Sequence, residues 1–387
     1  MKYTEIAGDY TIINVETPVN ISIENLIGDY DTVRLESSEE SLLKEIFQIY
    51  IMNDTLYILD HSKTTVSIFS NTGKYINKIH TVGQGPDEYI QISSFSIDYI
   101  NKQIVVMDAY SKKIILYDRN GNHEKTVLLN FVPVRIASTT SGFVHFCSEP
   151  KATPPYSMFP YEEMETSNVH FFDKKGNFLH AAKQDDTPQT IEIRSAHALI
   201  NLKDGTFLYQ PALSDTIYIV NENSIGLKYV IQSGSAYKIP SYKDRQKISF
   251  SLDNKNGREH IKNMIDDKYL FSWGEILDSD DYFYVGFSGL LSNDKVKVYY
   301  SKSKDKTITV SSNSIKGNKI LADIFLNTPL VTDNKSFYTV IPARIMYDET
   351  SAGKLPEGKM KTFLSGTDID DTNPLLIRFT LNDSIFD

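Results

Sequence analysis

Eight histidines are the side chains in this sequence best suited to acid–base or metal chemistry, and they are scattered along it. They are His61, His80, His123, His145, His170, His180, His197 and His260. None forms the H-x-H or H-E-x-x-H spacing that brings two imidazoles to one metal ion. His145 and His170 flank an insertion on two adjoining predicted strands, so we expect them to be cross-strand neighbours. A solvent-exposed pair without a catalytic role is the favoured interpretation.

Two acidic runs offer oxygen ligands for Ca²⁺, DSDD at Asp278–Asp281 and DIDDTN at Asp368–Asn373. The second run has oxygen-bearing side chains at positions 368, 370 and 372, but it lacks the glycine and the final glutamate of an EF-hand loop. We therefore favour solvated turns over metal sites, and we expect no cofactor.

The sequence lacks the signatures of nucleophilic and nucleotide chemistry. It contains neither G-x-S-x-G nor a glycine-rich nucleotide fingerprint. The single Cys147 excludes an internal disulfide and a multi-cysteine metal site, and a buried free thiol is its favoured role. A site assembled from distant strands would carry no local signature, so a hydrolase or lyase remains an alternative.

A glycine-rich loop, VGQGPDEY at Val82–Tyr89, is the most distinctive local motif. Its glycines permit positive φ, its proline fixes φ, and its glutamate can accept backbone N–H groups that the turn leaves unpaired. No lysine follows the second glycine and no helix is predicted after the loop, which excludes a phosphate-binding loop. The favoured role is a structural turn built by Gly83, Gly85, Pro86, Glu88 and Tyr89.

A repeated β unit must position these residues. A cadence of an aromatic residue, small polar residues and glycine recurs in IFSNTG (Ile68–Gly73), LYDRNG (Leu116–Gly121) and FFDKKG (Phe171–Gly176). Six apolar markers stand before such turns, at steps of about 50 or about 80 residues: Phe69, Tyr117, Phe172, Val220, Tyr300 and Phe379. Propeller blades typically need about 40 to 50 residues. The sequence therefore predicts an all-β, six-bladed β-propeller with four-stranded antiparallel blades and insertions in the longer steps.

Asp60 and Asp108 fall at the ends of equivalent strands in the first two blades. Aspartate at a strand-to-turn junction usually accepts hydrogen bonds from backbone amides two residues further on. We therefore interpret both as parts of the repeat and not as catalytic groups.

Composition favours one domain without nucleic-acid partners. Radial repetition lets 387 residues fold as one domain, and the 24 tyrosines and 20 phenylalanines suit packing between blades. We expect a lead-in over residues 1–30 and one propeller over residues 31–387. The net charge of −10 argues against a nucleic-acid or anionic-membrane surface. No apolar run reaches the roughly 18 residues of a membrane span.

The motif VGQGPDEY, together with LYILD and IFSNTGKYINKI before it and FSIDYINKQIVVMD after it, resembles a six-bladed β-propeller family abundant in gut Bacteroidetes. That family is similar to NHL-repeat propellers and usually carries a lipoprotein leader. Asp87 stands where the family more often has glycine. The resemblance covers roughly residues 31–130, and beyond them only the repeat pattern continues. It implies a periplasmic or cell-surface protein, lipid-anchored through a leader outside this sequence, without an established activity or catalytic residues.

Closure of the predicted ring assigns a partner to the spare N-terminal strand. Thr32–Leu35 precedes the four strands of the first blade, and we expect it to pair with Leu375–Leu381 and complete the sixth. A helical insertion is expected near residues 241–266, because Ser241 with Asp244 matches a capping pair and an apolar face follows at Ile261, Met264 and Ile265.

The insertions suggest where a ligand binds. Strand alternation places Cys147–Thr166, Gln232–Lys268, Pro342–Pro374 and the motif loop at the same end of their blades. Loops on a rigid scaffold often carry binding sites. In TPPYSMFPY, the rings of Tyr156, Phe159 and Tyr161 are candidates to stack on a sugar or peptide, although stapling of the loop to the scaffold is favoured.

The sequence thus predicts a monomeric, non-catalytic recognition protein that binds a glycan, peptide or protein at its loop-rich face. The alternatives are a hydrolase or lyase with its site at the mouth of the central channel, and a structural scaffold.

Overall fold

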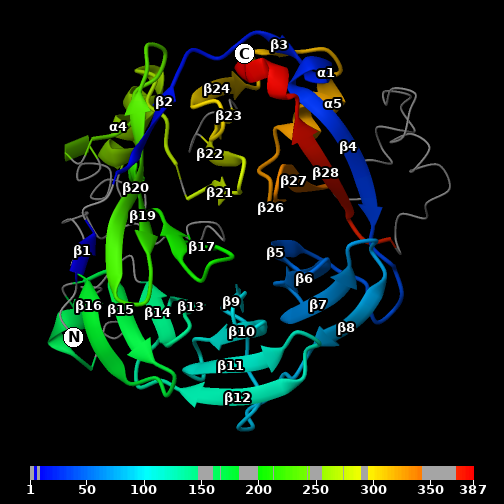
Figure 1. The fold of residues 1–387 in the computed structure, drawn as a ribbon, viewed down its shortest axis with the longest axis vertical. Coiled ribbons are helices and arrows are strands. Elements are labelled where there is room, and N and C mark those ends of the chain that lie inside the picture. The colour runs from blue at the N-terminus through cyan, green and yellow to red at the C-terminus, as the bar shows by residue number, and fades with distance from the viewer. Residues whose placement is uncertain are drawn as a thin grey trace. The chain divides into compact units, whose positions relative to one another are not determined.

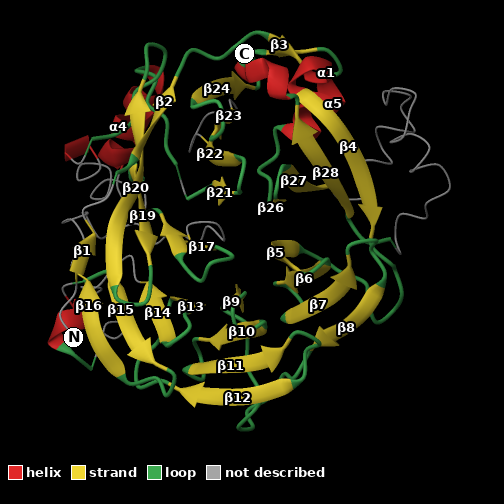
Figure 2. Ribbon diagram, in the orientation of Figure 1, coloured by secondary structure: helices red, strands yellow, loops and turns green. Residues whose placement is uncertain are grey.

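A computed structural model gives the fold and describes residues 4–6, 9–146, 160–165, 167–182, 199–211, 213–241, 243–244, 255–272, 274–288, 295–341 and 372–387. Strands predominate over helices in these residues (Figure 2). Within these residues, six sheets follow one another along the chain, and each contains the four strands expected for one blade (Figure 1). A seventh, two-stranded sheet pairs Ile21–Ser22 with Ile315–Lys316. The prediction of an all-β, six-bladed propeller is confirmed.

The chain divides into two compact units, of which one comprises Met1–Glu16, Thr81–Ile276 and Phe287–Asn293. The second sheet consists of β9 (Ser94–Asp98), β10 (Gln103–Asp108), β11 (Lys113–Asp118) and β12 (His123–Leu128). The third consists of β13 (Arg135–Ser138), β14 (Gly142–Phe146), β15 (Val169–Asp173) and β16 (Phe178–Ala182). The fourth consists of β17 (Leu199–Asn201), β18 (Phe207–Tyr209), β19 (Thr216–Val220) and β20 (Ser224–Ser233).

Two N-terminal strands extend the fourth sheet. Both β1 (Thr4–Ile6) and β2 (Thr11–Val15) pair with β20 in parallel, although the rest of that sheet is antiparallel. The same unit contains α2 (Glu162–Glu165) and α4 (Lys255–Asp266). A core of apolar side chains, among them Val105, Phe131 and Phe172, joins the second sheet to the third.

The other unit comprises Thr17–His80, Leu277–Gly286 and Asp294–Asp387. Its first sheet consists of β5 (Ile46–Met52), β6 (Thr55–Asp60), β7 (Thr65–Ser70) and β8 (Tyr75–Ile79). The fifth sheet, most of which lies in this unit, consists of β21 (Ile276–Asp278), β22 (Tyr282–Ser288), β23 (Lys295–Ser301) and β24 (Lys306–Ser311). Smaller elements are β3 (Ile21–Ser22), α1 (Ile23–Leu26), β25 (Ile315–Lys316), α5 (Lys319–Phe325) and η1 (Asp383–Phe386).

The sixth sheet is built from both ends of the chain, with the strand order β26 (Val331–Asp333), β27 (Ser336–Ile341), β28 (Leu375–Leu381) and β4 (Ile27–Arg34). Antiparallel pairing joins Arg34 to Leu375 and Thr32 to Ile377. The predicted closure is confirmed, and the closing strand is longer than expected because it begins at Ile27 and not at Thr32.

The glycines of the repeated aromatic–polar–glycine pattern lie in tight turns that need a positive φ. In the turn after β11 the carboxylate of Asp118 accepts hydrogen bonds from the backbone N–H groups of Asn120 and Asn122, both at 2.8 Å. The glycine inside this turn, Gly121, has a φ of 87°, which an L side chain rarely adopts. Asp173 and Gly176 repeat the arrangement after β15, where Gly176 has a φ of 81°.

The expected helical insertion is confirmed by α4 and by a capping pair before it. The hydroxyl of Ser241 donates to Asp244 Oδ2 at 2.7 Å, and the backbone N–H of Ser241 donates to the same oxygen at 3.0 Å. Met264 of α4 is buried against Leu213 and Phe271. Ile265 packs at the margin of this cluster, whereas the side chain of Ile261 lies outside the described residues.

Asn373 reinforces the closure of the sixth sheet. Its Oδ1 accepts the backbone N–H of Leu43 at 2.6 Å, and its Nδ2 donates to the carbonyls of Glu36 at 2.8 Å and Ser41 at 3.1 Å. The side chain is only 3% exposed, so water cannot replace these bonds. It therefore ties the segment that follows β4 to the segment that precedes β28.

We expect Asn373→Ala to lower the free energy of unfolding by about 2–3 kcal/mol, because the N–H of Leu43 and the carbonyl of Ser41, both in buried residues, lose their partner. Urea denaturation measures this change. The control is Asn71→Ala, in an exposed turn, which should change stability by less than about 0.5 kcal/mol. Equal stabilities for the two variants would contradict the assignment of Asn373 as a closure clamp.

Candidate functional site

The motif loop, Val82–Tyr89, is closed by its own backbone. The N–H of Gly83 donates to the carbonyl of Tyr89 at 2.9 Å, and the N–H of Tyr89 donates to the carbonyl of Thr81 at 3.1 Å. Tyr89 is completely buried beneath the loop. Its burial, followed in size by the nearby Tyr117, raises the pKa of Tyr89 above its usual range, so this phenol stays neutral.

Glu88 holds the turn as predicted, since its carboxylate accepts the N–H of Gly85 at 2.7 Å. The expected reason for the glycines is wrong, because neither Gly83 nor Gly85 has a positive φ. They provide space instead. A Cβ atom on Gly83 would lie 2.0 Å from Glu88 Oε2, and one on Gly85 would lie 3.0 Å from it. Each glycine therefore lets the backbone approach the carboxylate.

A buried lysine anchors the loop to β11. The ammonium group of Lys113 donates to the carbonyls of Gly85 at 2.6 Å and Glu88 at 3.0 Å. At the tip of the loop, Asp87 accepts from the hydroxyl of Thr126 at 3.2 Å and pairs with His123 at 3.3 Å. Both partners belong to β12, so the loop is fixed at its base and at its tip to one sheet.

Asp108 joins the exit of this loop to the turn between β10 and β11. One carboxylate oxygen accepts the N–H of Ile90 at 2.7 Å, and the other accepts the N–H of Tyr110 at 2.9 Å. Asp60 does the same in the first sheet, where it accepts the N–H groups of Lys44 at 2.6 Å and Lys63 at 3.1 Å. Both aspartates are fully buried, so the interpretation that they maintain the repeat is confirmed.

Three exposed apolar side chains lie on this braced backbone, those of Val82, Ile90 and Tyr110, and we call them together the motif-loop surface. Their exposed fractions are 49%, 44% and 68%. Val82 pairs with Tyr89, the residue before Ile90, and Asp108 brings Ile90 next to Tyr110. The sequence reasoning missed this surface. An apolar residue directly after Tyr89 and another two residues after Asp108 were the available signals.

Of the ring residues predicted to bind a ligand, Tyr161 alone lies within the described part of the chain, and Tyr156 and Phe159 lie outside it. Tyr161 is 39% exposed and stacks on Phe178 of the edge strand β16, with ring centroids 4.6 Å apart and an interplanar angle of 18°. Nearby Met164 of α2 is completely buried. Tyr161 therefore has the position that the stapling alternative requires, and the motif-loop surface does not include it.

His145 and His170 are directly opposed on β14 and β15, as predicted, but the expectation of a solvent-exposed pair is wrong. Both imidazoles are completely buried. Phe131 meets His145 edge-on at 4.9 Å between centroids and stacks on Phe172, so the aromatic core of the third sheet covers the pair.

Hydrogen-bond partners assign the protons of this pair. The N–H of Val134 donates to His145 Nε2 at 3.0 Å, so that nitrogen carries no proton. His170 Nε2 faces the carbonyl of Ser167 at 2.8 Å and must donate to it. The proton between the two rings therefore sits on His145 Nδ1, which donates to His170 Nδ1 at 2.9 Å. Both histidines are neutral, and every ring nitrogen has a partner.

Burial governs the acidity of the pair. It holds the pKa of His145 well below its usual range, with the neighbouring His170 adding to the effect, and it lowers the pKa of His170 to about 4. An imidazole that is neutral, buried and bonded at both nitrogens cannot exchange protons with a substrate. The histidine pair is therefore a structural group of the third sheet.

The acidic turns give no metal site among the described residues. Asp278, at the start of DSDD, pairs with Lys302 at 2.8 Å. In DIDDTN, positions 368–371 lie outside the described residues, and Asn373 serves the closure.

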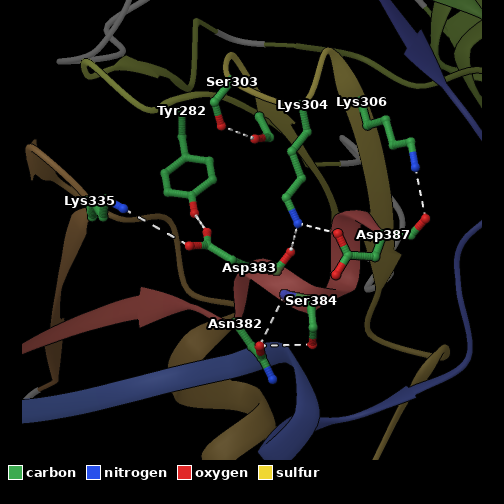
Figure 3. Close-up of polar contacts among 10 residues, drawn as sticks. Tyr282, Ser303, Lys304, Lys306, Lys335, Asn382, Asp383, Ser384 and Asp387 are labelled. Atoms are coloured by element: carbon green, nitrogen blue, oxygen red, sulfur yellow. Dashed lines mark hydrogen bonds and ion pairs between the residues drawn. The ribbon is translucent and has the colours of Figure 1, made fainter.

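A dense cluster of charged side chains surrounds η1, and Figure 3 shows it. Asp383 accepts from the hydroxyl of Tyr282 and lies 4.0 Å from the ammonium of Lys335. Lys304 donates to the carbonyl of Asp383 at 2.9 Å, and Lys306 donates to a backbone oxygen of Asp387 at 2.8 Å. Burial, then the bond to Asp383, raises the pKa of Tyr282. These contacts hold η1 beside β24. The charged side chains of the cluster bond to one another or to the backbone of η1.

We expect Glu88→Ala to lower the free energy of unfolding by about 1–3 kcal/mol, because the N–H of Gly85 loses its acceptor. Thermal and urea unfolding measure the change. The matched control is Asp87→Gly, at the preceding position, which introduces the residue that the family more often has there. It should lower the free energy of unfolding by less than half as much as Glu88→Ala. Unchanged stability in Glu88→Ala would contradict a structural role for this carboxylate.

We expect stability to fall as the pH drops from 6.5 toward 4. In this window the histidines are protonated in the unfolded chain but stay neutral in the native pair. The stabilisation that is present above pH 6.5 is therefore lost, by roughly 3 kcal/mol for His170 alone. Urea unfolding at a series of pH values measures the slope. The double variant His145→Phe with His170→Leu should lose the part of the pH dependence that the pair causes. The control His123→Gln, at an exposed histidine, should keep that part. A slope unaffected by the double variant would contradict the assignment.

The comparison with one solved structure supports the fold. A Bacteroides fragilis protein named as a candidate exported protein superposes with a TM-score of 0.76 at 16% identity, covering 96% of this chain and 100% of that one. A member of the DUF4221 family from Bacteroides vulgatus has a TM-score of 0.48 at 10% identity, covering 93% and 99%. No curated protein matches the sequence. None of the described helices is long and apolar enough to cross a membrane.

The family assignment rests on nearly the whole chain and agrees with the resemblance read from the motif loop. The matching family model extends over residues 10–380, from the strand that joins the fourth sheet to the last strand of the sixth. The chain belongs to the family described as Domain of unknown function (DUF4934).

Proposed function

We propose that this protein is a non-catalytic recognition protein of the cell envelope, and that it binds a partner polypeptide through the motif-loop surface. The observation that carries the proposal is the exposure of Val82, Ile90 and Tyr110 on a backbone held by buried groups. Isolated apolar residues on a surface are ordinary, whereas three exposed on neighbouring parts of the backbone favour an interaction site.

The rigidity of the surface favours tight recognition. Lys113 fixes the loop backbone at two carbonyls, and Asp108 fixes the positions of Ile90 and Tyr110. A surface that is already ordered loses little conformational entropy when a partner binds. Tyr110, with an exposed fraction of 68%, is the side chain best placed to act as an aromatic anchor.

The chemistry of the surface favours a polypeptide among the three ligand classes considered. A glycan is usually held by flat aromatic faces together with polar groups, and this surface contains one tyrosine among aliphatic side chains. Valine and isoleucine gain mostly from contact with other apolar side chains, which a protein or peptide supplies.

A hydrolase or lyase receives less support from the described residues. The histidine pair is neutral and bonded at every nitrogen, and the carboxylates of Asp60 and Asp108 hold backbone amides. A purely structural scaffold would not need an exposed apolar surface beside a braced loop. Placement in the cell envelope draws on the family resemblance and on the export assignment in the name of the Bacteroides fragilis neighbour.

A photo-crosslinking amino acid at position 110 tests the proposal in cells that make the protein. We expect a discrete polypeptide adduct, and purified partner should then bind the wild-type protein in solution. Ile90→Ser should weaken that binding at least about tenfold, in line with the loss of a buried aliphatic contact at an interface.

Ile100→Ser is the matched control, because Ile100 has an exposed fraction of 45%, close to the 44% of Ile90, but lies at the other end of β9. It should leave binding unchanged. Equal effects of the two substitutions, or adducts to sugars and not to polypeptides, would contradict the proposal.

A further inference from the structure

The strand β2 forms an edge of the fourth sheet and presents an apolar side to solvent. Its inward residues Ile13 and Val15 are completely buried, whereas Tyr10, just before the strand, and Ile12 have exposed fractions of 51% and 43%. Among the described strands, β20 is the one that pairs with β2. The opposite edge of β2 thus offers backbone groups beside two exposed apolar side chains.

The last strand of each of three other sheets carries charges that β2 lacks. Charged residues occur in β8 (Lys78), β12 (Glu124 and Lys125) and β4 (Asp29, Asp31 and Arg34). Such charges are the usual protection of exposed strand edges against pairing with another chain. The sequence of β2, TIINV, contains no charge, proline or glycine.

Two further edge strands are covered by other parts of the chain. Tyr161, just before α2, stacks on Phe178 of β16, which is also uncharged. In the fifth sheet, the N–H of Val19 donates to the carbonyl of Thr309 in β24 at 2.9 Å, and the cluster around η1 binds Lys306 of the same strand. Within the described residues, β2 is therefore an edge with neither charge nor cover.

This edge is firmly seated and can act as a template. Gly234, which follows β20, lets Val15 approach so closely that a Cβ atom there would lie 2.0 Å from the Val15 carbonyl oxygen. Together with the burial of Ile13 and Val15, this close fit holds β2 against β20. A partner strand would meet an ordered strand and not a frayed terminus.

We infer that the outer edge of β2 binds an extended segment of a partner polypeptide by strand addition. The segment should carry apolar residues at alternate positions, to cover Tyr10 and Ile12. It should be basic at the end that lies beside Asp9, which precedes the strand and is exposed. A second copy of this chain is a poorer occupant, since each copy brings a net charge of −10.

The test uses the whole chain and a fluorescein-labelled peptide of alternating valine and threonine with a lysine at each end. We expect saturable binding by fluorescence anisotropy, and slower hydrogen exchange of the β2 amides when the peptide is added. Ile12→Lys places a charge on the exposed side and should weaken binding at least about tenfold. Tyr10→Lys, just outside the strand, should act in the same direction and serves if Ile12→Lys unfolds.

Val19→Lys, with an exposed fraction of 37% outside β2, is the matched control and should bind as the wild type does. Ile90→Ser should also leave peptide binding unchanged, which separates this inference from the proposed function. No peptide binding, or equal binding by Ile12→Lys, would overturn it. A concentration-dependent dimer that Ile12→Lys abolishes would assign the edge to a second copy and would also overturn it.

Discussion

The pairing of β4 with β28 is the contact on which the rest of the fold depends. A series of β-sheets has a first and a last member, and each would expose an edge unless the chain joins them. Here one sheet uses strands from both ends of the sequence, and Asn373 bonds to Leu43 across 330 positions of the sequence. Contacts so distant in sequence form late in folding, because loop-closure entropy opposes them. Once these contacts have formed, the stability of the first sheet depends on that of the sixth.

The same scaffold uses several of its buried or turn-forming polar side chains to bind its own backbone. Asp60 and Asp108 bind incoming amides at one end of their sheets, and Asp118 and Asp173 bind turn amides at the other. Lys113 is bound to carbonyls, and the buried histidines are bound to each other. Repetition explains this use of side chains, since each sheet must end and turn in the same way. Of the motif loop and its neighbours, the exposed side chains of Val82, Ile90 and Tyr110 are apolar.

Much of this architecture could be predicted because it depends on local pattern. The spacing of turns located the sheets, and the period of two along strands placed His145 opposite His170. Burial of the pair could not be predicted in this way. It depends on Phe131, which comes from outside both strands and closes over the rings. The glycines of the motif loop illustrate a second difficulty, because glycine can serve a positive φ or a close approach, and the sequence does not distinguish them.

The candidate site was harder to predict than the fold. Ile90 and Tyr110 are separated by a whole hairpin, and a single carboxylate, that of Asp108, brings them together. A sequence pattern shows that Asp108 ends a strand, but not which amide from the preceding segment it will bind. The aromatic run around Tyr161 drew attention because of its composition, whereas its ring serves Phe178. An aromatic composition shows that rings are available to stack on something. The packing of the fold decides whether they stack on a ligand or on the protein itself.

The parallel attachment of β2 to β20 has a consequence for the growing chain. The strands β2, β3 and β4 emerge from the ribosome well before their partners β20, β25 and β28. At a synthesis rate of about 5–20 residues per second, β2 waits about 10–45 s for β20 and β4 waits about 20–70 s for β28. During this time an uncharged segment such as TIINV is open to any passing strand. A chaperone that covers this segment until β20 has been synthesised would protect the growing chain from such pairing.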